Sequence, residues 1–367
     1  MQATDIFVIG GGPAGLATAI AARRKGLQVT LADGARPPID KACGEGLMPD
    51  GLAALRSLGI TIEAGEAHAF HGIRFVGAGV SVEAGFPEGY ALGVRRTVLH
   101  PKMIRAASAA GVRMLWGTTV TGICAEGVKL EGQTVPARWI VGADGFHSRV
   151  RRWAGLSACR LKPQRFGFRI HCRVAPWSDS MELHWGAGCQ IYVTPVSPEE
   201  VCVALISRDS HLRLDKALEQ FPELRARLGG ACRTTSERGA VTANCRLRRV
   251  WRDRVALVGD ASGSVDAITG EGLCQSFRQA IALADSLAMG TLAHYQAVHR
   301  SLAKRPTLMA NCMLALDQRT GLRRRALQAL AAQPGIFRNM LSMHVGVLSP
   351  VEFAASGCAL AWRMLIG

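Results

Sequence analysis

Apolar positions change their period along the chain, and the change predicts an α/β protein. A short apolar run at residues 6–9 is typical of a buried strand, an Ala-rich helical stretch follows it, and a second strand is predicted over residues 28–31. Residues 166–207 instead alternate apolar and polar positions in four segments separated by turn residues, as in an antiparallel sheet. After residue 296 the apolar residues recur at helical spacing.

The turn after the first strand carries three glycines at the spacing of a dinucleotide-binding loop. Gly10, Gly12 and Gly15 form G-x-G-x-x-G between the predicted strand and the predicted helix. The first glycine allows the tight turn, the second allows close approach of a pyrophosphate, and the third lets the helix pack on the strand. Asp33 ends the second strand, where a carboxylate accepts from a ribose hydroxyl. This unit predicts a dinucleotide site, but it does not distinguish FAD from NAD.

Two further segments resemble motifs of the flavin-dependent hydroxylase and geranylgeranyl reductase superfamily, which has the para-hydroxybenzoate hydroxylase fold. They are WIVGADGFHSRVR at 139–151 and RVALVGDASGSVDAITGEGL at 254–273. With GGGPAG they match the three motifs of the superfamily in order, across about residues 1–290. The resemblance implies FAD as the cofactor. Because no second dinucleotide motif occurs, we expect NAD(P)H to dock transiently on the FAD domain as the reductant, or a protein donor to deliver the electrons.

The resemblance also implies a set of cofactor-binding residues. Asp260 would hold the ribose or ribitol of FAD, Asp144 would lie near the pyrophosphate, and Val120 would contact the adenine through its backbone. Arg96 is either a residue near FAD or a surface charge. The full predicted set is Gly10, Gly12, Pro13, Ala14, Gly15, Asp33, Arg96, Val120, Asp144, Gly145, Gly259, Asp260, Gly270, Gly272 and Leu273.

The same resemblance predicts how the domains are arranged. We expect a Rossmann-like FAD-binding domain formed by residues 1–80, 95–160 and 250–295, and an inserted antiparallel β-sheet substrate domain at 81–94 and 161–249. C-terminal helices cover residues 296–367, where Met309, Met313, Leu314 and Leu316 form an apolar stripe typical of a core. The inserted sheet would lay an apolar wall over the flavin, with the candidates Phe166, Phe168, Trp185, Ile191 and Tyr192.

The motifs leave the reaction open between an oxygenase and a reductase. Gly263 and Ala267 replace a His and a Pro that hydroxylases commonly carry, whereas CGEGL at 43–47 and TGEG at 269–272 resemble the geranylgeranyl reductases. We predict a monooxygenase acting on a lipophilic aromatic or polyketide-like substrate, either free or carried on a thioester or lipid. The alternatives are a reductase of isoprenoid double bonds and a membrane-associated flavin electron-transfer protein.

No residue is assigned as catalytic from the sequence, but three are candidates. Glu45 and Glu271 are carboxylates in Gly-rich loops, where burial would raise a pKa enough for acid–base work, unless each simply bonds to backbone. Cys43 would be a gate beside the flavin, a redox thiol, or small packing. No Cys or His spacing indicates a metal site.

Composition changes this picture only at the surface. The chain has 44 Lys and Arg against 28 Asp and Glu, a net charge of +16, yet it carries no nucleic-acid-binding motif, so we expect no nucleic-acid partner. Eleven scattered cysteines and the lack of a leader segment favour a reducing, cytoplasmic location. The tail from residue 345 is too interrupted to span a bilayer, but with the Arg cluster at 323–325 it suits peripheral contact with the inner membrane face.

Overall fold

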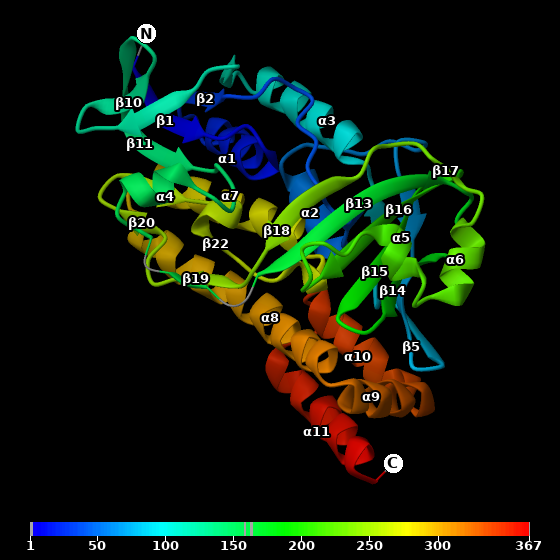
Figure 1. Ribbon diagram of the computed structural model, residues 1–367. Coiled ribbons are helices and arrows are strands. Elements are labelled where there is room, and N and C mark those ends of the chain that lie inside the picture. Colours follow the sequence, from blue (N-terminus) through cyan, green and yellow to red (C-terminus); the bar gives the residue numbers. More distant parts are fainter. Residues whose placement is uncertain (1–2, 158, 162–163, 367) are drawn as a thin grey trace.

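The first of two large sheets is mostly parallel and carries the glycine-rich turn. In the computed structural model, which describes residues 3–157, 159–161 and 164–366, its strand order is β20-β21-β11-β1-β2-β8, with β9 and β10 as an antiparallel extension of β11 (Figure 1). The strands are β1 (Thr4–Ile9), β2 (Val29–Asp33), β8 (Arg113–Trp116), β9 (Val120–Ile123), β10 (Gly127–Leu130), β11 (Gln133–Gly142), β20 (Trp251–Arg252) and β21 (Val255–Leu257). Ile6, Phe7 and Val8 are fully buried, which explains why this strand is apolar at consecutive positions.

Helices beside this sheet bring distant segments of the chain together. They are α1 (Pro13–Arg24), α2 (Pro49–Ser57), α3 (Arg96–Ala109), α4 (Arg149–Trp153) and α7 (Gly272–Ala288). Helix α1 contacts both α3 and α7, so the start of the chain packs against a helix that begins after residue 270. Pro13 occupies the first turn of α1, where its missing N–H costs nothing.

The second large sheet is the predicted substrate sheet. Its order is β17-β13-β16-β15-β14-β5-β6, with β18 also paired to β13, and all of its pairs are antiparallel except β14 with β5. The strands are β5 (Gly72–Gly77), β6 (Val80–Gly85), β13 (Arg165–Arg173), β14 (Ser180–Trp185), β15 (Cys189–Ser197), β16 (Glu200–Ser207), β17 (Cys232–Arg233) and β18 (Arg238–Thr242). Because β5 and β6 join it, this sheet also takes in residues 72–80, which the sequence had grouped with the FAD region.

Both faces of the second sheet are covered. Helices α5 (Leu214–Leu218) and α6 (Pro222–Leu228) pack on the face that carries Ile191 and Val193. The opposite face, which carries Trp185 and Tyr192, packs against the C-terminal helices. Adjacent residues of β15 therefore serve two different cores, as strand alternation requires.

Short elements and the C-terminal helices complete the chain. There are also two three-stranded sheets. One has the order β3 (Gly46–Leu47), β7 (Ala91–Gly93) and β4 (His68–Phe70), and the other has the order β12 (Cys159–Leu161), β19 (Cys245–Leu247) and β22 (Gly263–Ser264). Two 3₁₀ turns, η1 (Gly259–Ser262) and η2 (Ala267–Thr269), precede α7. The C-terminal helices are α8 (Ala293–Gln318), α9 (Thr320–Ala332), α10 (Pro334–His344) and α11 (Pro350–Ile366), and α11 lies beside α9 and α10 at the edge of the molecule (Figure 1).

Two observations bear on the location predicted for the protein. Across the described residues, no helix has both the length and the apolar character needed to cross a bilayer. Nine cysteines of the described chain carry free thiols, whereas Cys245 is disulfide-bonded, which a reducing compartment would not favour.

Candidate functional site

One large cavity gathers nearly all of the predicted site residues. It has a volume of about 600 Å³ and lies where the loops at the ends of the parallel strands meet the substrate sheet. Of the predicted cofactor residues, all except Gly15 and Gly259 line it, and so do the catalytic candidates Cys43, Glu45 and Glu271. The three motifs, far apart in the sequence, therefore face one space.

The glycines of the first motif differ in what they permit. A Cβ atom at Gly15 would lie 1.9 Å from the carbonyl oxygen of Gly10, so this glycine is needed for the helix to pack on the turn. A Cβ at Gly12 would meet no atom within 4 Å, and Gly12 lines the cavity at the start of α1. The space beside it, at a helix N-terminus with unpaired N–H groups, suits a phosphate group.

Two residues hold this turn in place, and only one of them was predicted. Asp33 accepts hydrogen bonds from the backbone N–H groups of Gly11, at 2.6 Å, and Ala35, at 2.7 Å. His100 is fully buried, accepts from the N–H of Ile39 at 3.2 Å and therefore donates through Nε2 to the carbonyl oxygen of Gly11, at 2.9 Å. Burial lowers the pKa of His100, which keeps the ring neutral. A single His on an unremarkable helix gives no sequence signal for this role.

The second motif forms a helix cap at the cavity wall. The Asp144 carboxylate accepts from the Ser148 hydroxyl at 2.5 Å and from the N–H groups of Arg149 and Val150 at 2.7 and 3.1 Å. These are the first residues of α4, where an acidic side chain satisfies unpaired donors. Asp144 therefore positions α4 while it lines the cavity. Val120, at the start of β9, also lines the cavity.

A buried polar network supports the third motif. The Gln279 side chain, from α7, accepts the Gly259 N–H at 2.9 Å, and the Ser262 hydroxyl lies 2.9 Å from Nε2 of His299. Burial lowers the pKa of His299 to about 4, so this ring is neutral. Asp260 stands at the cavity beside this network with its side chain 42% exposed, 3.5 Å from Nζ of Lys41. Gln279 and His299 lie outside every motif.

Arg96 is buried rather than a surface charge. It begins α3, is 7% exposed and lines the cavity, and its Nε atom is buried without a hydrogen-bond partner. Among the described residues no carboxylate forms an ion pair with its guanidinium. A buried cation without a partner is costly, so this position suits an anionic ligand.

Glu271 connects the cavity with the C-terminal helices. It is 5% exposed at the N-terminus of α7, and its carboxylate lies 3.6 Å from Arg305 of α8 and 3.7 Å from His344 of α10. Burial raises the pKa of Glu271 despite these two neighbours. The sequence did not suggest that Arg305 or His344 reaches the site.

Cys43 and Glu45 lie together in the cavity wall. The Glu45 N–H contacts Sγ of Cys43 at 3.4 Å, and burial raises the pKa of the Cys43 thiol. The Glu45 carboxylate accepts the Arg96 N–H at 3.0 Å and lies 2.6 Å from Nε2 of His171. The Glu45 carboxylate therefore bonds to backbone, which was one of the two roles expected for it. It also contacts the His171 side chain, which no motif indicates.

The predicted apolar wall divides between the cavity and the protein core. Phe168 and Tyr192 line the cavity, whereas Trp185 and Ile191 are in hydrophobic cores. Phe166 does not reach the cavity. Strand alternation explains Ile191, which lies on the opposite face from its neighbour Tyr192, whereas Trp185 shares the face of Tyr192 but packs in the core with the C-terminal helices.

Comparison with known proteins identifies the family. A family model described as FAD binding domain matches residues 3–296. The chain belongs to this FAD-binding family. The menaquinone reductase of Mycolicibacterium smegmatis is 27% identical over 81% of this chain and 80% of its own, and the 6-methylpretetramide 4-monooxygenase of Streptomyces rimosus is 27% identical over 78% and 76%. A solved geranylgeranyl bacteriochlorophyll reductase-like protein from Thermoplasma acidophilum shares the fold, with a TM-score of 0.76, 20% identity and coverage of 99% and 97%.

The chain is thus an FAD-dependent oxidoreductase of the superfamily that the motifs indicated. The site fits the cofactor on two independent grounds, the open space beside Gly12 and the unpaired cation of Arg96. The Gly12 turn and Arg96 would hold the negatively charged part of FAD, and the N-terminus of α7 at Gly270–Leu273 would face its ring.

We predict that Gly12→Ala prevents flavin binding, whereas Gly15→Ala destabilises the fold. A methyl group at position 12 projects into the cavity, so this variant should purify without bound flavin and melt at the temperature of the flavin-free wild-type protein. A methyl group at position 15 clashes with backbone, so that variant should unfold at a lower temperature. Flavin absorbance and thermal melting of the purified proteins check both. A yellow Gly12→Ala protein would contradict the assignment.

Glu271→Gln should stabilise the protein increasingly as pH rises. A carboxyl whose pKa is raised by folding contributes stability below its ordinary value of 4.5 and loses that contribution as pH rises through the raised value. Glutamine does not titrate, so the melting temperature of the variant minus that of wild type should increase between pH 4.5 and 8. The exposed Glu199→Gln is the control and should give a flat difference. A decrease would mean that Arg305 and His344 stabilise the ionised form.

Proposed function

We propose that this FAD-dependent oxidoreductase hydroxylates a lipophilic aromatic substrate whose ring carries polar substituents. The observation that carries the proposal is Thr194 of β15, which lines the cavity, is fully buried, and has a hydroxyl group with no hydrogen-bond partner among the described residues. A buried hydroxyl without a partner costs about 1–3 kcal/mol. A ring hydroxyl or carbonyl of the substrate would satisfy it, whereas a plain alkene would not.

The apolar part of the substrate would enter a second cavity of about 40 Å³, which would have to widen by movement of its methionine side chains. This cavity adjoins the first, because Met181, Tyr192 and Thr269 line both. Its other walls are side chains of the substrate sheet and of α8 and α10, among them Phe75, Leu183, Met309, Met313, Phe337 and Leu341. The predicted apolar stripe of α8 therefore lies partly in the core and, through Met309 and Met313, partly in the cavity wall. Flexible methionine side chains can adapt to apolar chains of different shape.

In this proposal, bound FAD carries electrons from NAD(P)H to dioxygen. The balance is substrate C–H, O₂, NAD(P)H and H⁺ giving substrate C–OH, NAD(P)⁺ and H₂O. The protein's part is to bind the ring at Thr194, to exclude water with Phe168 and Tyr192, and to supply and remove protons at the buried carboxyls.

Reduction of an isoprenoid double bond is the second candidate. It is favoured by the Cys43 thiol at the cavity wall, because burial keeps it protonated and hence able to give a proton. The relatives named menaquinone reductase, 27–28% identical to this chain, favour a reduction over an oxygenation.

Oxygen labelling separates the two reactions. The yellow protein is incubated with NAD(P)H, ¹⁸O₂ and a panel of alkyl-substituted phenols, quinolones and prenylated quinones. Hydroxylation predicts a product heavier by one ¹⁸O atom, detected by mass spectrometry. A product that has gained two hydrogens and no label, formed equally well without oxygen, would replace the hydroxylase with the reductase.

A lipophilic substrate is consistent with contact between the C-terminal helices and an anionic membrane surface. Of the Arg cluster, Arg324 and Arg325 are exposed, whereas Arg323 is buried and lies over the ring of Trp185. In α11, which contacts α9, Val351 is 83% exposed, and Val347 just before α11 is 51% exposed. Exposed cations next to an apolar surface are typical of peripheral binding.

We predict that the protein co-sediments with vesicles of anionic lipid but not of zwitterionic lipid. Arg324→Glu with Arg325→Glu should abolish sedimentation, since each cation near the surface contributes about 1 kcal/mol. Arg213→Glu, an exposed cation on the α5 side of the substrate sheet, is the matched control and should retain binding. Failure of the wild-type protein to sediment at low salt would remove the membrane proposal.

A further inference from the structure

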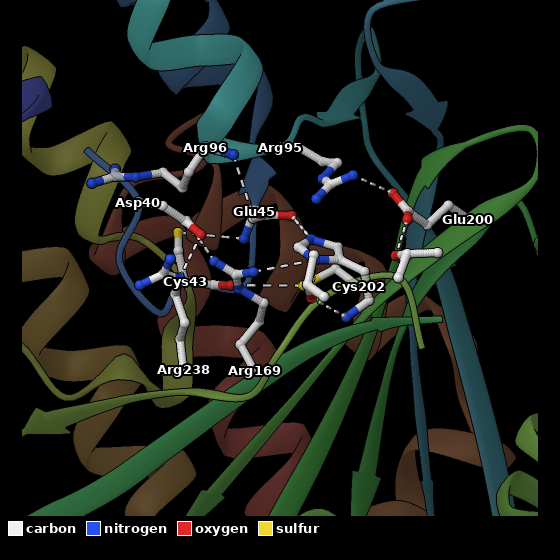
Figure 2. Close-up of polar contacts among 12 residues, drawn as sticks. Asp40, Cys43, Glu45, Arg95, Arg96, Arg169, Glu200, Cys202 and Arg238 are labelled. Atoms are coloured by element: carbon white, nitrogen blue, oxygen red, sulfur yellow. Dashed lines mark hydrogen bonds and ion pairs between the residues drawn. The ribbon is translucent and has the colours of Figure 1, made fainter. Parts of the chain in front are cut away.

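We propose that Thr235, His171 and Glu45 form a proton relay between the protein surface and the cavity. The relay extends the proposed function. It rests on that function only in assuming that the cavity holds the reacting groups. Figure 2 shows the residues around it: Asp40, Cys43 and Glu45 from the loop before β3, Arg95 and Arg96 at the start of α3, and Arg169 and Cys202 from the substrate sheet.

The contacts of the relay are continuous. Oε2 of Glu45, a residue of the cavity wall, lies 2.6 Å from Nε2 of His171. Nδ1 of His171 lies 3.0 Å from the hydroxyl of Thr235, which is half-buried in the loop between β17 and β18. Glu45 and His171 are each 1% exposed, so Thr235 is the one residue of the three that is partly exposed to solvent.

The position of Glu45 is fixed at some cost to the backbone. Its φ angle is 60°, in the left-handed region that non-glycine residues rarely occupy. The conformation is held from two sides, because the Glu45 carbonyl accepts from the N–H of Val94 at 2.9 Å and its carboxylate accepts from the N–H of Arg96 at 3.0 Å. Strain of this kind gathers at functional sites, where the surrounding structure determines the geometry.

Arg169 decides which tautomer His171 adopts. Its Nη1 atom lies 3.2 Å from Nδ1 of His171, and a guanidinium only donates hydrogen bonds. Nδ1 therefore accepts, and the ring carries its proton on Nε2, directed at the Glu45 carboxylate. The Thr235 hydroxyl accepts the backbone N–H of His171 at 3.1 Å, which leaves its own proton free to point at Nδ1.

This tautomer is set for delivery of a proton into the cavity. The Nε2 proton passes to Oε2 of Glu45, which passes a proton on to the reacting group. The Thr235 hydroxyl proton passes to Nδ1, and Thr235 takes a proton from water. One proton then moves from water to the cavity, each relay group keeps its number of protons, and His171 is left with its proton on Nδ1. The reverse sequence, which starts from that tautomer, removes a proton from the substrate and restores the His171 proton to Nε2.

None of the charged or thiol groups around Glu45 and His171 offers a second route for the proton, so the proton is exchanged with solvent through Thr235. Arg169 donates to Asp40 at 2.6 Å, and Arg238 pairs with the same carboxylate at 2.7 Å, but an arginine does not release its proton. Arg96 approaches Glu45 through its backbone, and Cys43 and Cys202 lie beside the pair as thiols whose pKa values are raised by burial. Arg95 and Thr234 instead bond to Glu200.

The test uses the FAD-loaded protein and three threonine variants. Thr235→Val removes the hydroxyl, Thr235→Ser retains it, and Thr234→Val removes the neighbouring hydroxyl that is outside the relay. Bound FAD is photoreduced anaerobically in weakly buffered solution, and flavin absorbance and a pH-indicator dye are followed together. In wild type, Thr235→Ser and Thr234→Val, proton uptake should keep pace with reduction. In Thr235→Val it should lag, and this readout does not require a known substrate.

Steady-state kinetics supply the second readout, once a substrate is known. Thr235→Val should lower kcat about tenfold with KM unchanged, and Glu45→Gln or His171→Gln about 10²-fold. The loss should depend on pH and grow in D₂O, which a purely structural defect would not produce. If no substrate is turned over, the proposed function fails while the dye measurement still decides the relay.

Two results would overturn the relay. One is simultaneous proton uptake and flavin reduction in a Thr235→Val protein that melts and binds FAD like wild type. The other is a stoichiometric metal ion in the purified protein that is lost from His171→Gln, because ligand atoms of Glu45, His171 and Cys202 lie within 4.8 Å of one another. That result would make the three residues a metal site.

Discussion

The cavity exists because of one close approach between backbones. A Cβ atom at Gly10 would lie 2.4 Å from the carbonyl oxygen of Ala143, at the end of β11. The first and second motifs therefore meet without side chains between them, and Gly15 repeats the requirement between helix and turn. Asp33 and His100 then fix the turn from outside through Gly11. If the strand ends were pushed apart here, the three motifs would no longer face one space.

Local sequence was sufficient for the parts that depend on local geometry. Strand periodicity gave four strands of the substrate sheet, and the glycine spacing gave the first turn, because each depends on neighbouring residues. The parallel pairing of β5 with β14 joins segments more than a hundred residues apart, and nothing in either segment specifies the other. Likewise, alternation places Ile191 and Tyr192 on opposite faces, but only the packing of α5 and α10 determines which face meets the cavity.

The polar contacts of the site were the least predictable from sequence. Glu45 and Glu271 were visible as carboxylates in glycine-rich loops, but their partners His171, Arg305 and His344 lie on other elements and in no motif. The local sequence around either partner does not specify such a polar pair, because the two residues come together only in the folded structure. Burial is informative at the cavity wall, because a ligand could supply the missing partner of an unpaired polar group such as Arg96 Nε or the Thr194 hydroxyl.

The basic composition has a structural explanation for some of its arginines. Arg165 pairs with Asp266 at 2.9 Å and contacts Gln190, which contacts Asp317, which in turn pairs with Arg208. This chain of contacts ties the 3₁₀ turn η2 of the flavin region to two strands of the substrate sheet and to α8. A planar guanidinium with five donors suits such buried junctions better than lysine does. These arginines are occupied within the fold, whereas exposed ones, among them Arg324 and Arg325 of α9, remain available to an outside partner.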